Sequence, residues 1–442
     1  MSKDKNAPIA IIGGGAWGLS TALHLSLTGY SDITVFDRAE TIPSHFSAAY
    51  DLNKIVRAEY EDEFYTQLAL VSDPRLENPL FGPYYHQTGY IVATSGEAPP
   101  KAVNSMEKAL ASVSKHPKFA LDIHSLTTRE EFRGHAWQFS GPLNGFRGYF
   151  NPLAGYAHSG NALKGVCLHL ASRGVKFLLG ETRGKVIELL YDNGPGGSST
   201  RRCTGVVTAD NEIHRAAISI CALDAYGASL IPELGYFAVA RCWSVAHVQL
   251  TEQECDLLRN LPVTNVRDLG FFFEPDPATR LFKLCPLGAG YSNTDASGTS
   301  LPPPDELPEP QGYIPLEDER KLRQLLRETL PWMADRPFVD KKMCWFSDTQ
   351  DSEYCVDFVP GTGDSLVVLA GDSGHGFKMM PVFGKWVVDL LQDRKQKLAR
   401  WRWQQHDGQG NNWADSVSWR VGNAREIGEL IEEKNRITRA YL

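Results

Sequence analysis

The chain begins with a short apolar run that ends in glycines. Residues 8–12 are apolar, three glycines follow at 13–15, and apolar side chains then recur at helical spacing over 19–25. A second apolar run occupies residues 33–36. Short apolar runs bounded by glycine are typical of buried strands, and the longer spaced pattern is typical of a helix. The pattern therefore predicts a strand, a tight turn, a helix and a second strand.

Further along the chain, helical and strand patterns alternate. Helical spacing predicts helices over 64–71, 101–115 and 160–173. Strands are expected at 88–93, 175–179, 240–250, 271–274 and 281–284, and a hairpin is expected to join 185–191 to 203–209. A late run at 366–370 is apolar throughout and ends at Gly371. Such a run suits a strand of a parallel sheet that is buried on both faces.

The first strand, turn and helix carry the residues of a dinucleotide-binding fingerprint. Gly13 permits the tight turn, Gly15 allows a diphosphate to approach the backbone, and Gly18 allows helix and strand to pack closely. The N–H groups at the start of the helix can bind the anion. Asp37, at the end of the second strand, stands where an acid would hydrogen-bond a ribose hydroxyl. A dinucleotide site is therefore expected, and a purely structural glycine turn is the alternative.

Composition narrows the class of protein. The chain has 442 residues, is 42% hydrophobic and carries a formal net charge of -8. A negative charge without basic blocks argues against a nucleic-acid partner. The eight cysteines form no C-x-x-C pair, which argues against a disulfide framework. With no apolar signal region, no membrane-length apolar run and a C-terminus that is not Ser-Lys-Leu, we expect a cytoplasmic protein.

A second glycine-rich turn places the chain near a known family. Residues 371–378 follow the late apolar strand and precede the apolar stretch 384–391. Together with the N-terminal fingerprint, this segment resembles the C-terminal flavin motif of the monomeric sarcosine oxidase and amadoriase (fructosyl amino acid oxidase) family. The resemblance implies FAD as cofactor, with backbone N–H groups of the turn stabilising negative charge on the reduced ring.

Residues 344–351 are similar to the Cys-x-x-x-x-Thr-x-Asp stretch of that family. In the family the cysteine carries the flavin covalently, so the resemblance assigns the attachment to Cys344. The alternative is a buried and inert cysteine.

The segment 50–57 combines features of both branches of the family. Lys54 matches the basic residue near the flavin in both branches, and Arg57 matches the substrate-carboxylate arginine of the sarcosine branch. Arg57 and Lys378 are therefore expected to hold an amino-acid carboxylate. For Arg57 the alternative is a surface-helix ion pair with Glu59 or Glu61.

Lys283 resembles the lysine that activates dioxygen in this family, since it lies within the apolar strand 281–284. A fixed cation in a dry site stabilises the negative charge that oxygen gains. The alternative is a strand-end lysine that reaches solvent.

Three segments bear on the choice between branches. The turn 222–227 departs from the family's Ala-Gly-Ala-Trp-like pattern, which leaves its flavin contact open. Residues 285–290 lack the acidic residue that amadoriases carry there, which weakens an assignment to glycated amino acids. Residues 400–403 are amadoriase-like, with an amphipathic cover helix as the alternative.

The resemblance implies an α/β fold in which a Rossmann-type FAD-binding domain contains an inserted mixed-sheet cover domain. We assign residues 1–85, 150–228 and 340–400 to the FAD-binding domain, 86–149 and 229–339 to the cover domain, and 401–442 to a C-terminal helical extension. The expected catalytic residues are Lys54, Arg57, Lys283 and Lys378. The expected cofactor-binding residues are Gly13, Gly15, Ala16, Trp17, Gly18, Asp37, Arg38, Ser44, Lys54, Val186, Cys344, Asp372, Gly374, His375, Gly376, Phe377 and Lys378, and no metal is expected.

The function expected from these residues is oxidation of a secondary amine by FAD. The substrate is expected to be an N-alkyl or N-methyl amino acid, with dioxygen as acceptor, giving an imine and hydrogen peroxide. The alternatives are an amadoriase acting on fructosyl amino acids, a saccharopine or pipecolate oxidase, and, in a different class, a flavin dehydrogenase or a non-catalytic nucleotide-binding protein that does not use oxygen. No nucleic-acid or membrane partner is expected, and the protein is expected to be a monomer.

Overall fold

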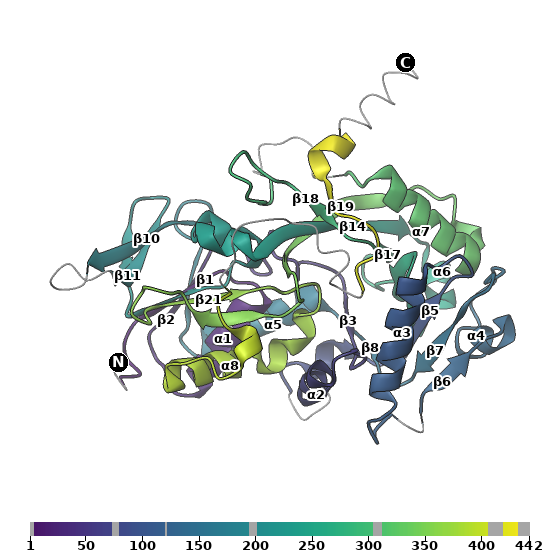
Figure 1. Ribbon diagram of the computed structural model, residues 1–442, viewed down its shortest axis with the longest axis horizontal. Coiled ribbons are helices and arrows are strands. Elements are labelled where there is room, and N and C mark those ends of the chain that lie inside the picture. Colours follow the sequence, from purple (N-terminus) through teal and green to yellow (C-terminus); the bar gives the residue numbers. More distant parts are fainter. Residues whose placement is uncertain are drawn as a thin grey trace, which may run out of the picture.

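The computed structural model describes residues 4–72, 79–119, 122–193, 201–303, 312–404 and 419–431. Two large sheets divide the molecule (Figure 1). The sheet that contains β1 and β2 lies with α1, α5 and α8 on one side of the view, and the sheet that contains β5 and β7 lies with α3, α4, α6 and α7 on the other. The long strand β14 (Ala238–Gln249) extends between them.

The first sheet has six strands in the order β20-β21-β13-β1-β2-β9. All its neighbours are parallel except β20 and β21, which are antiparallel. Its strands are β1 (Ile9–Ile12), β2 (Ile33–Asp37), β9 (Lys176–Leu179), β13 (Ile218–Cys221), β20 (Cys355–Phe358) and β21 (Leu366–Ala370). The late strand β21 therefore belongs to the same sheet as the N-terminal fingerprint and is joined to β1 through β13.

Close packing of helices on this sheet depends on glycine. The helices are α1 (Ala16–Leu27), α5 (Ser159–Ser172) and α8 (Met380–Asp393). A Cβ atom on Gly18 would lie 1.9 Å from the carbonyl oxygen of Gly13, and one on Gly384 would lie 2.0 Å from that of Ser20. Any side chain at either glycine would separate α1 from β1 or from α8. This accounts for the third glycine of the fingerprint.

The second sheet is mixed, with the order β22-β18-β14-β17-β16-β15-β5-β7-β6, and β19 pairs with β14 beside this path. Its remaining strands are β5 (Tyr90–Thr94), β6 (His124–Leu126), β7 (Arg147–Asn151), β15 (Val263–Val266), β16 (Gly270–Phe272), β17 (Leu281–Pro286), β18 (Tyr291–Ser292), β19 (Val339–Thr349) and β22 (Arg425–Glu426). The helices on the same side of the view as this sheet are α3 (Pro100–Val113), α4 (Arg129–His135), α6 (Glu252–Leu257) and α7 (Leu316–Thr329).

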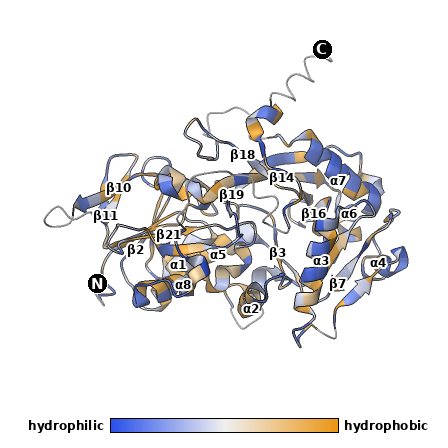
Figure 2. Ribbon diagram, viewed as in Figure 1, coloured by the Kyte–Doolittle hydropathy of each residue, from blue (hydrophilic) through white to orange (hydrophobic). Residues whose placement is uncertain are grey.

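Strand alternation gives this sheet two different faces. Phe282 and Leu284 of β17 are fully buried and share a hydrophobic core with Leu322 and Leu326 of α7. The intervening Lys283 points to the opposite face. The visible side of α7 is mostly hydrophilic (Figure 2), so its apolar residues are turned to the sheet. One face of the sheet is therefore a core, and the other can form a site.

Two small antiparallel sheets complete the fold. One contains β10 (Val186–Asn193), β11 (Arg201–Thr208) and β12 (Ile213–Arg215), and the other contains β3 (Lys54–Val56), β8 (Gly155–Ala157) and β4 (Tyr85–His86). Helix α2 (Glu63–Val71) follows β3. In the described part of the chain, no helix combines the length and the apolar character needed to cross a bilayer.

The expected elements are found with shifted ends. The strand expected at 88–93 is β5 (Tyr90–Thr94), that at 271–274 is β16 (Gly270–Phe272), and the predicted hairpin is the antiparallel pair of β10 and β11. The α/β fold is confirmed. The domain boundaries stay a prediction. The extension at 401–442 lies largely outside the described residues, and its described part contributes the strand β22, which pairs with β18.

Candidate active site

A cavity of about 380 Å³ lies where residues of the two large sheets meet. The structure brings most of the predicted site residues to its wall. Those in the lining are Gly13, Gly15, Ala16, Trp17, Asp37, Arg38, Ser44, Lys54, Arg57, Val186, Lys283, Cys344, Asp372, Gly374, His375, Phe377 and Lys378. Gly18 and Gly376 are not in the lining. Gly18 is covered by the Gly13 carbonyl, and a Cβ atom on Gly376 would lie 2.3 Å from the Asp372 carboxylate.

The turn after β1 carries no side chain at Gly13, so a ligand can approach its backbone closely. Gly13 has φ +110°, and a Cβ atom there would lie 2.5 Å from the carbonyl oxygen of Ala222. Asp37 accepts hydrogen bonds from the N–H groups of Gly14, at 2.8 Å, and Ala39, at 2.9 Å. These bonds fix the carboxylate beside the turn and leave further lone pairs on its oxygens. Contact of Asp37 with a ribose stays a prediction.

The second glycine turn is held by its own aspartate. The carboxylate of Asp372 accepts from the N–H groups of Gly374, at 2.8 Å, and Gly376, at 3.0 Å. Asp224 lies next to it and accepts from the N–H of Ser347 at 2.9 Å. Burial and the nearby Asp372 carboxylate raise the pKa of Asp224 to about 7. The negative charge of one carboxylate therefore makes ionisation of its neighbour less favourable.

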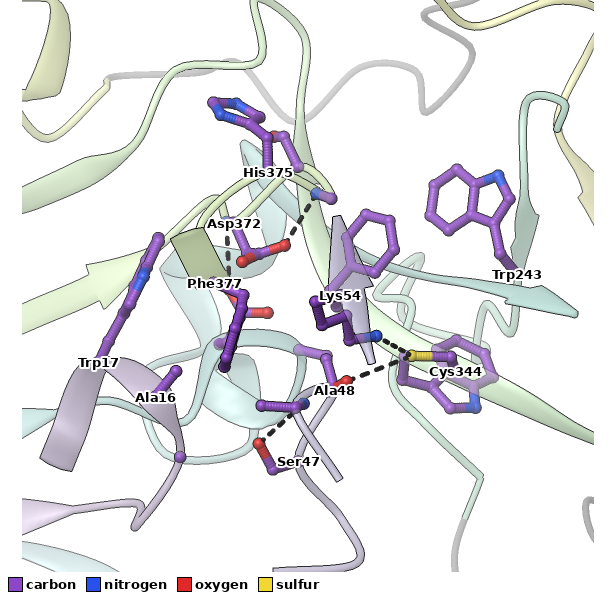
Figure 3. Close-up of a pocket in the computed structure, with 18 of the residues that line it drawn as sticks. Ala16, Trp17, Ser47, Ala48, Lys54, Trp243, Cys344, Asp372, His375 and Phe377 are labelled. Atoms are coloured by element: carbon purple, nitrogen blue, oxygen red, sulfur yellow. Dashed lines mark hydrogen bonds between the residues drawn. The ribbon is translucent and has the colours of Figure 1, made fainter. Parts of the chain in front are cut away.

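Lys54 and Cys344 point toward one another across the cavity (Figure 3). The Nζ atom of Lys54 is 4.0 Å from the Cys344 Sγ atom, and the thiol donates to the carbonyl of Ala48 at 3.8 Å. Cys344 is half-buried and open to the cavity. The alternative of a fully buried, inert cysteine does not agree with this exposure.

Lys283 belongs to a buried cluster with Asp51. Its side chain is 1% exposed, and its ammonium donates to the carbonyl of Asn53 at 2.8 Å and forms an ion pair with Asp51. Asp51 also pairs with Lys54 at 2.9 Å. Burial by itself raises the pKa of Asp51, but Lys283 and Lys54 hold it below the usual range. Two cations and one anion leave a net positive charge in the wall, and Lys283 does not reach solvent.

Arg57 follows β3 and faces the cavity. Its guanidinium lies 4.8 Å from the ring centre of Tyr60, and its Nη1 atom has no hydrogen-bond partner. Within the described ranges it forms no ion pair, and Glu59 instead accepts from Asn151 at 2.7 Å. The alternative of a surface-helix ion pair is therefore wrong. A free guanidinium in a cavity wall is suited to bind an anion.

Lys378 lies beside Arg57 on the other glycine segment. Its Nζ atom donates to the hydroxyl of Tyr60 at 2.7 Å and to the carbonyl of His375 at 3.0 Å. Burial and the charge of Arg57 lower its pKa well below the ordinary value. An anion bound between Lys378 and Arg57 would offset the charge of Arg57 and so raise the pKa of Lys378. The protonation of Lys378 therefore depends on whether an anion is bound in the cavity.

Some lining residues were not identified from the sequence. Among them are Tyr60, Asp224, Arg267, Trp419 and Arg420. Arg420 pairs with Asp348 at 3.1 Å and lies 4.3 Å from the ring centre of Trp243. Arg267 could have been found from alternation, because it continues the spacing of Val263 and Asn265. The C-terminal segment that carries Arg420 contains no sequence motif that would have placed it in the site.

Comparison with known proteins identifies the class. Residues 8–390 match the family described as DAO, FAD dependent oxidoreductase, and the chain belongs to that family. It is 31% identical over 438 residues to the L-saccharopine oxidase of Schizosaccharomyces pombe, covering 97% of this chain and 98% of that protein. It is 23% identical over 406 residues to the monomeric sarcosine oxidase of Bacillus sp. (strain B-0618), covering 86% and 91%.

A solved structure agrees in fold over nearly the whole chain. The fructosamine oxidase of Aspergillus fumigatus (Amadoriase II) in complex with FSA matches with a TM-score of 0.86 and 31% identity, covering 97% of both chains. The protein is therefore an FAD-dependent oxidoreductase of the amine and amino acid oxidase type, and the predicted family and enzyme class are confirmed. Gly13 has no side chain that would keep a diphosphate from the backbone, and the carboxylate of Asp37 lies beside it. Both features fit FAD.

Proposed function

We propose that the protein oxidises a secondary amine that carries a carboxylate, an N-alkyl or N-methyl amino acid, and produces an imine and hydrogen peroxide. The observation that carries this proposal is the guanidinium of Arg57, which lines the cavity with an unpartnered Nη1 atom beside Lys378. A bidentate pair with a substrate carboxylate would satisfy this group. Because the carboxylate is held at one end, the amine of the substrate has a defined position in the cavity.

The cofactor would be held by the two glycine segments and attached through Cys344. Residues of both glycine segments, together with Asp37 and Cys344, line the cavity, and the Nζ atom of Lys54 lies near the Cys344 sulfur. FAD, when bound, supplies the acceptor for the two electrons of the amine and their transfer to dioxygen. In this arrangement the chain's own residues bind the carboxylate, orient the amine and exclude water.

Lys283 would act on dioxygen. Its side chain is 1% exposed and its ammonium is anchored by Asp51 and the Asn53 carbonyl, so the ammonium has a fixed position that water hardly reaches. A preorganised cation in such a place stabilises charge that develops on oxygen. We assign no general base, because an amine that binds already deprotonated needs none.

The test is a comparison of substrates. Purified holoenzyme is mixed with N-methyl amino acids and, in parallel, with fructosyl amino acids, and both flavin reduction without oxygen and peroxide release with oxygen are measured. N-methyl amino acids should reduce the flavin and yield peroxide. Reduction without peroxide would indicate a dehydrogenase, and a response only to fructosyl amino acids would overturn the proposal.

Oxidation of fructosyl amino acids is the second candidate. It is favoured by the match to Amadoriase II, which was solved in complex with FSA. The segment 285–290 lacks the acidic residue expected of that activity, and Cys285 and Leu287 line the cavity there instead. The similarity to L-saccharopine oxidase over 97% of the chain favours an amino-acid substrate over a glycated one.

A further inference from the structure

Two aspartates, Asp224 and Asp372, lie together at one edge of the first large sheet. The neighbouring strands β21, β13, β1 and β2 are parallel, so their carboxyl ends share this edge. Asp372 follows β21 closely, and Asp224 follows β13. Both line the cavity, as do Gly13 after β1 and Asp37 at the end of β2. The pair therefore lies in the crevice in which a parallel sheet of this kind binds a dinucleotide.

The order of the strands separates this pair from the residue expected to bind the adenosine ribose. Asp37 ends β2, whereas the pair follows β13 and β21, which lie on the other side of β1. With the ribose at Asp37 and the diphosphate at Gly13, the flavin half of FAD extends toward Asp224. The strand β19, which carries Cys344, contacts the same place, because the N–H of its Ser347 donates to Asp224 at 2.9 Å.

The hydrogen bonds of Asp224 come from neutral groups. Its carboxylate accepts from the N–H and the hydroxyl of Ser347 and, at 3.4 Å, from the N–H of Asp372. The Ser347 hydroxyl in turn accepts from the N–H of Gly371 at 2.7 Å. The backbone of Asp224 has φ +46°, in the left-handed region that favours glycine. A carboxylate kept at such a position in a cavity wall indicates a role for the side chain.

Asp372 holds a negative charge more readily than Asp224. Burial raises the pKa of Asp372, whereas the N–H of Gly374 and the charges of Lys54 and Lys378 act against this rise. Burial and the nearby Asp372 carboxylate raise the pKa of Asp224 to about 7, and the groups that oppose this rise are neutral donors. A further negative charge in the cavity would raise the pKa of Asp224 again. Asp224 is therefore the member of the pair that exchanges a proton.

Other titratable and charged groups surround the pair. Besides Lys54 and Lys378 they are His375, Tyr60, Tyr354 and the ion pair of Arg420 with Asp348. Burial lowers the pKa of His375 well below its ordinary value and raises the pKa of both phenols, which moves these three groups away from titration near neutral pH. Burial also lowers the pKa of Lys378, so Lys378 is the competing proton acceptor.

We infer that the Asp224–Asp372 pair takes up a proton from solvent when the bound cofactor is reduced and releases it when the cofactor is reoxidised. Reduction by two electrons and one proton leaves one negative charge on FAD, and the proton on the pair offsets that charge. Each reduction then consumes two electrons and two protons, and dioxygen receives the same number when it becomes hydrogen peroxide. The inference requires bound FAD and does not depend on the substrate proposed above.

The test is the reduction potential of the flavin in the holoenzyme, measured without substrate below and above pH 7. Below pH 7 the Asp224 carboxyl already holds its proton in the oxidised enzyme, so reduction adds none. Above pH 7 it is ionised and takes up a proton on reduction. One additional proton per two electrons makes the potential fall by about 30 mV more per pH unit. The wild-type enzyme should show up to this additional slope above pH 7, and Asp224→Asn should lack it.

Three variants complete the experiment. Asp224→Gly suits the positive φ and should give the same loss of slope if the asparagine variant does not fold. Asp364→Asn is the matched control, because Asp364 also has a positive φ, of +55°, but is exposed and pairs with Arg394 at 2.8 Å. It should keep the wild-type profile. Lys378→Met should retain the steeper region if the pair, and not Lys378, takes the proton.

Three results would overturn the inference. One is a wild-type potential without a steeper region above pH 7, and another is a steeper region that persists in Asp224→Asn or Asp224→Gly. The third is its loss in Lys378→Met with retention in the Asp224 variants. A pH indicator in weakly buffered solution counts the protons independently while the flavin is reduced electrochemically. Because no amine is used, a failed substrate assay leaves this result intact.

Discussion

Replacing Lys283 with methionine removes the one cation of the Asp51 cluster that is fully buried. Lys283 is 1% exposed, whereas the side chain of Lys54 is 23% exposed. The substitution keeps the length of the side chain and lowers the charge of the three-residue cluster from net +1 to 0. We expect reoxidation of the reduced flavin to slow, because oxygen gains negative charge in that step.

The size of the effect follows from the burial of the ammonium. At an effective dielectric constant of about 20, a unit charge acts on another at 4–6 Å with roughly 3–4 kcal/mol. Each 1.4 kcal/mol is about a factor of ten in rate, so the expected loss is on the order of 10² to 10³. Removal of a single preorganised donor from other enzyme sites costs a similar factor.

Stopped-flow absorbance separates the two half-reactions. Reduction by substrate without oxygen should change by less than about ten-fold, while reoxidation at known oxygen concentration should show the full loss. Lys342→Met is the matched control, because Lys342 also acts on Asp51 but donates to the carbonyl of Tyr50 and does not line the cavity. Equal slowing of both half-reactions would refute the reasoning and make Lys283 a structural residue, as would a wild-type rate of reoxidation.

Three further predictions concern the attachment and the carboxylate site. Acid-precipitated wild-type protein should stay yellow and Cys344→Ala should release its flavin; a colourless wild-type pellet would contradict the covalent bond. Arg57→Lys should raise the dissociation constant of carboxylate substrates by about 10- to 100-fold despite the retained charge, with a decarboxylated analogue binding both proteins equally poorly; unchanged affinity would remove Arg57 from the site. Burial and Arg57 depress the pKa of Lys378, and a bound carboxylate should raise it, so binding should take up protons. Calorimetry at several pH values, in buffers of different ionisation enthalpy, should detect this uptake in the range where free Lys378 titrates, and Lys378→Met should abolish it; uptake that persists in the variant would assign the proton to another group.

Much of the fold could be predicted because its signals are local. The strand, turn and helix around Gly13 depend on neighbours within a few residues, and so do the late strand β21 and its glycine turn. Strand ends were less accurate, as β5 and β16 show, because pairing partners decide where a strand stops. Candidate site residues that belong to a motif, such as Lys54 and Cys344, were brought to one cavity as expected.

Other features depended on contacts between distant segments. Lys283 was identified from its strand, but its pairing with Asp51 joins residues 232 positions apart. Asp224 and Asp372 act on each other across 148 positions, and Arg420 enters the cavity wall from a segment without a recognisable motif.

The sequence by itself determined the family, the two glycine cradles and the lysine and arginine residues that could bind charge. Only the tertiary structure decided which of those charges are balanced. Arg57 follows β3 and Arg267 follows β15, and nothing local to either segment indicates that both line one cavity without an ion pair to any residue that the structure describes. The physical reason is that a motif is a property of neighbouring residues, whereas burial and charge balance are sums over everything that packs around a group.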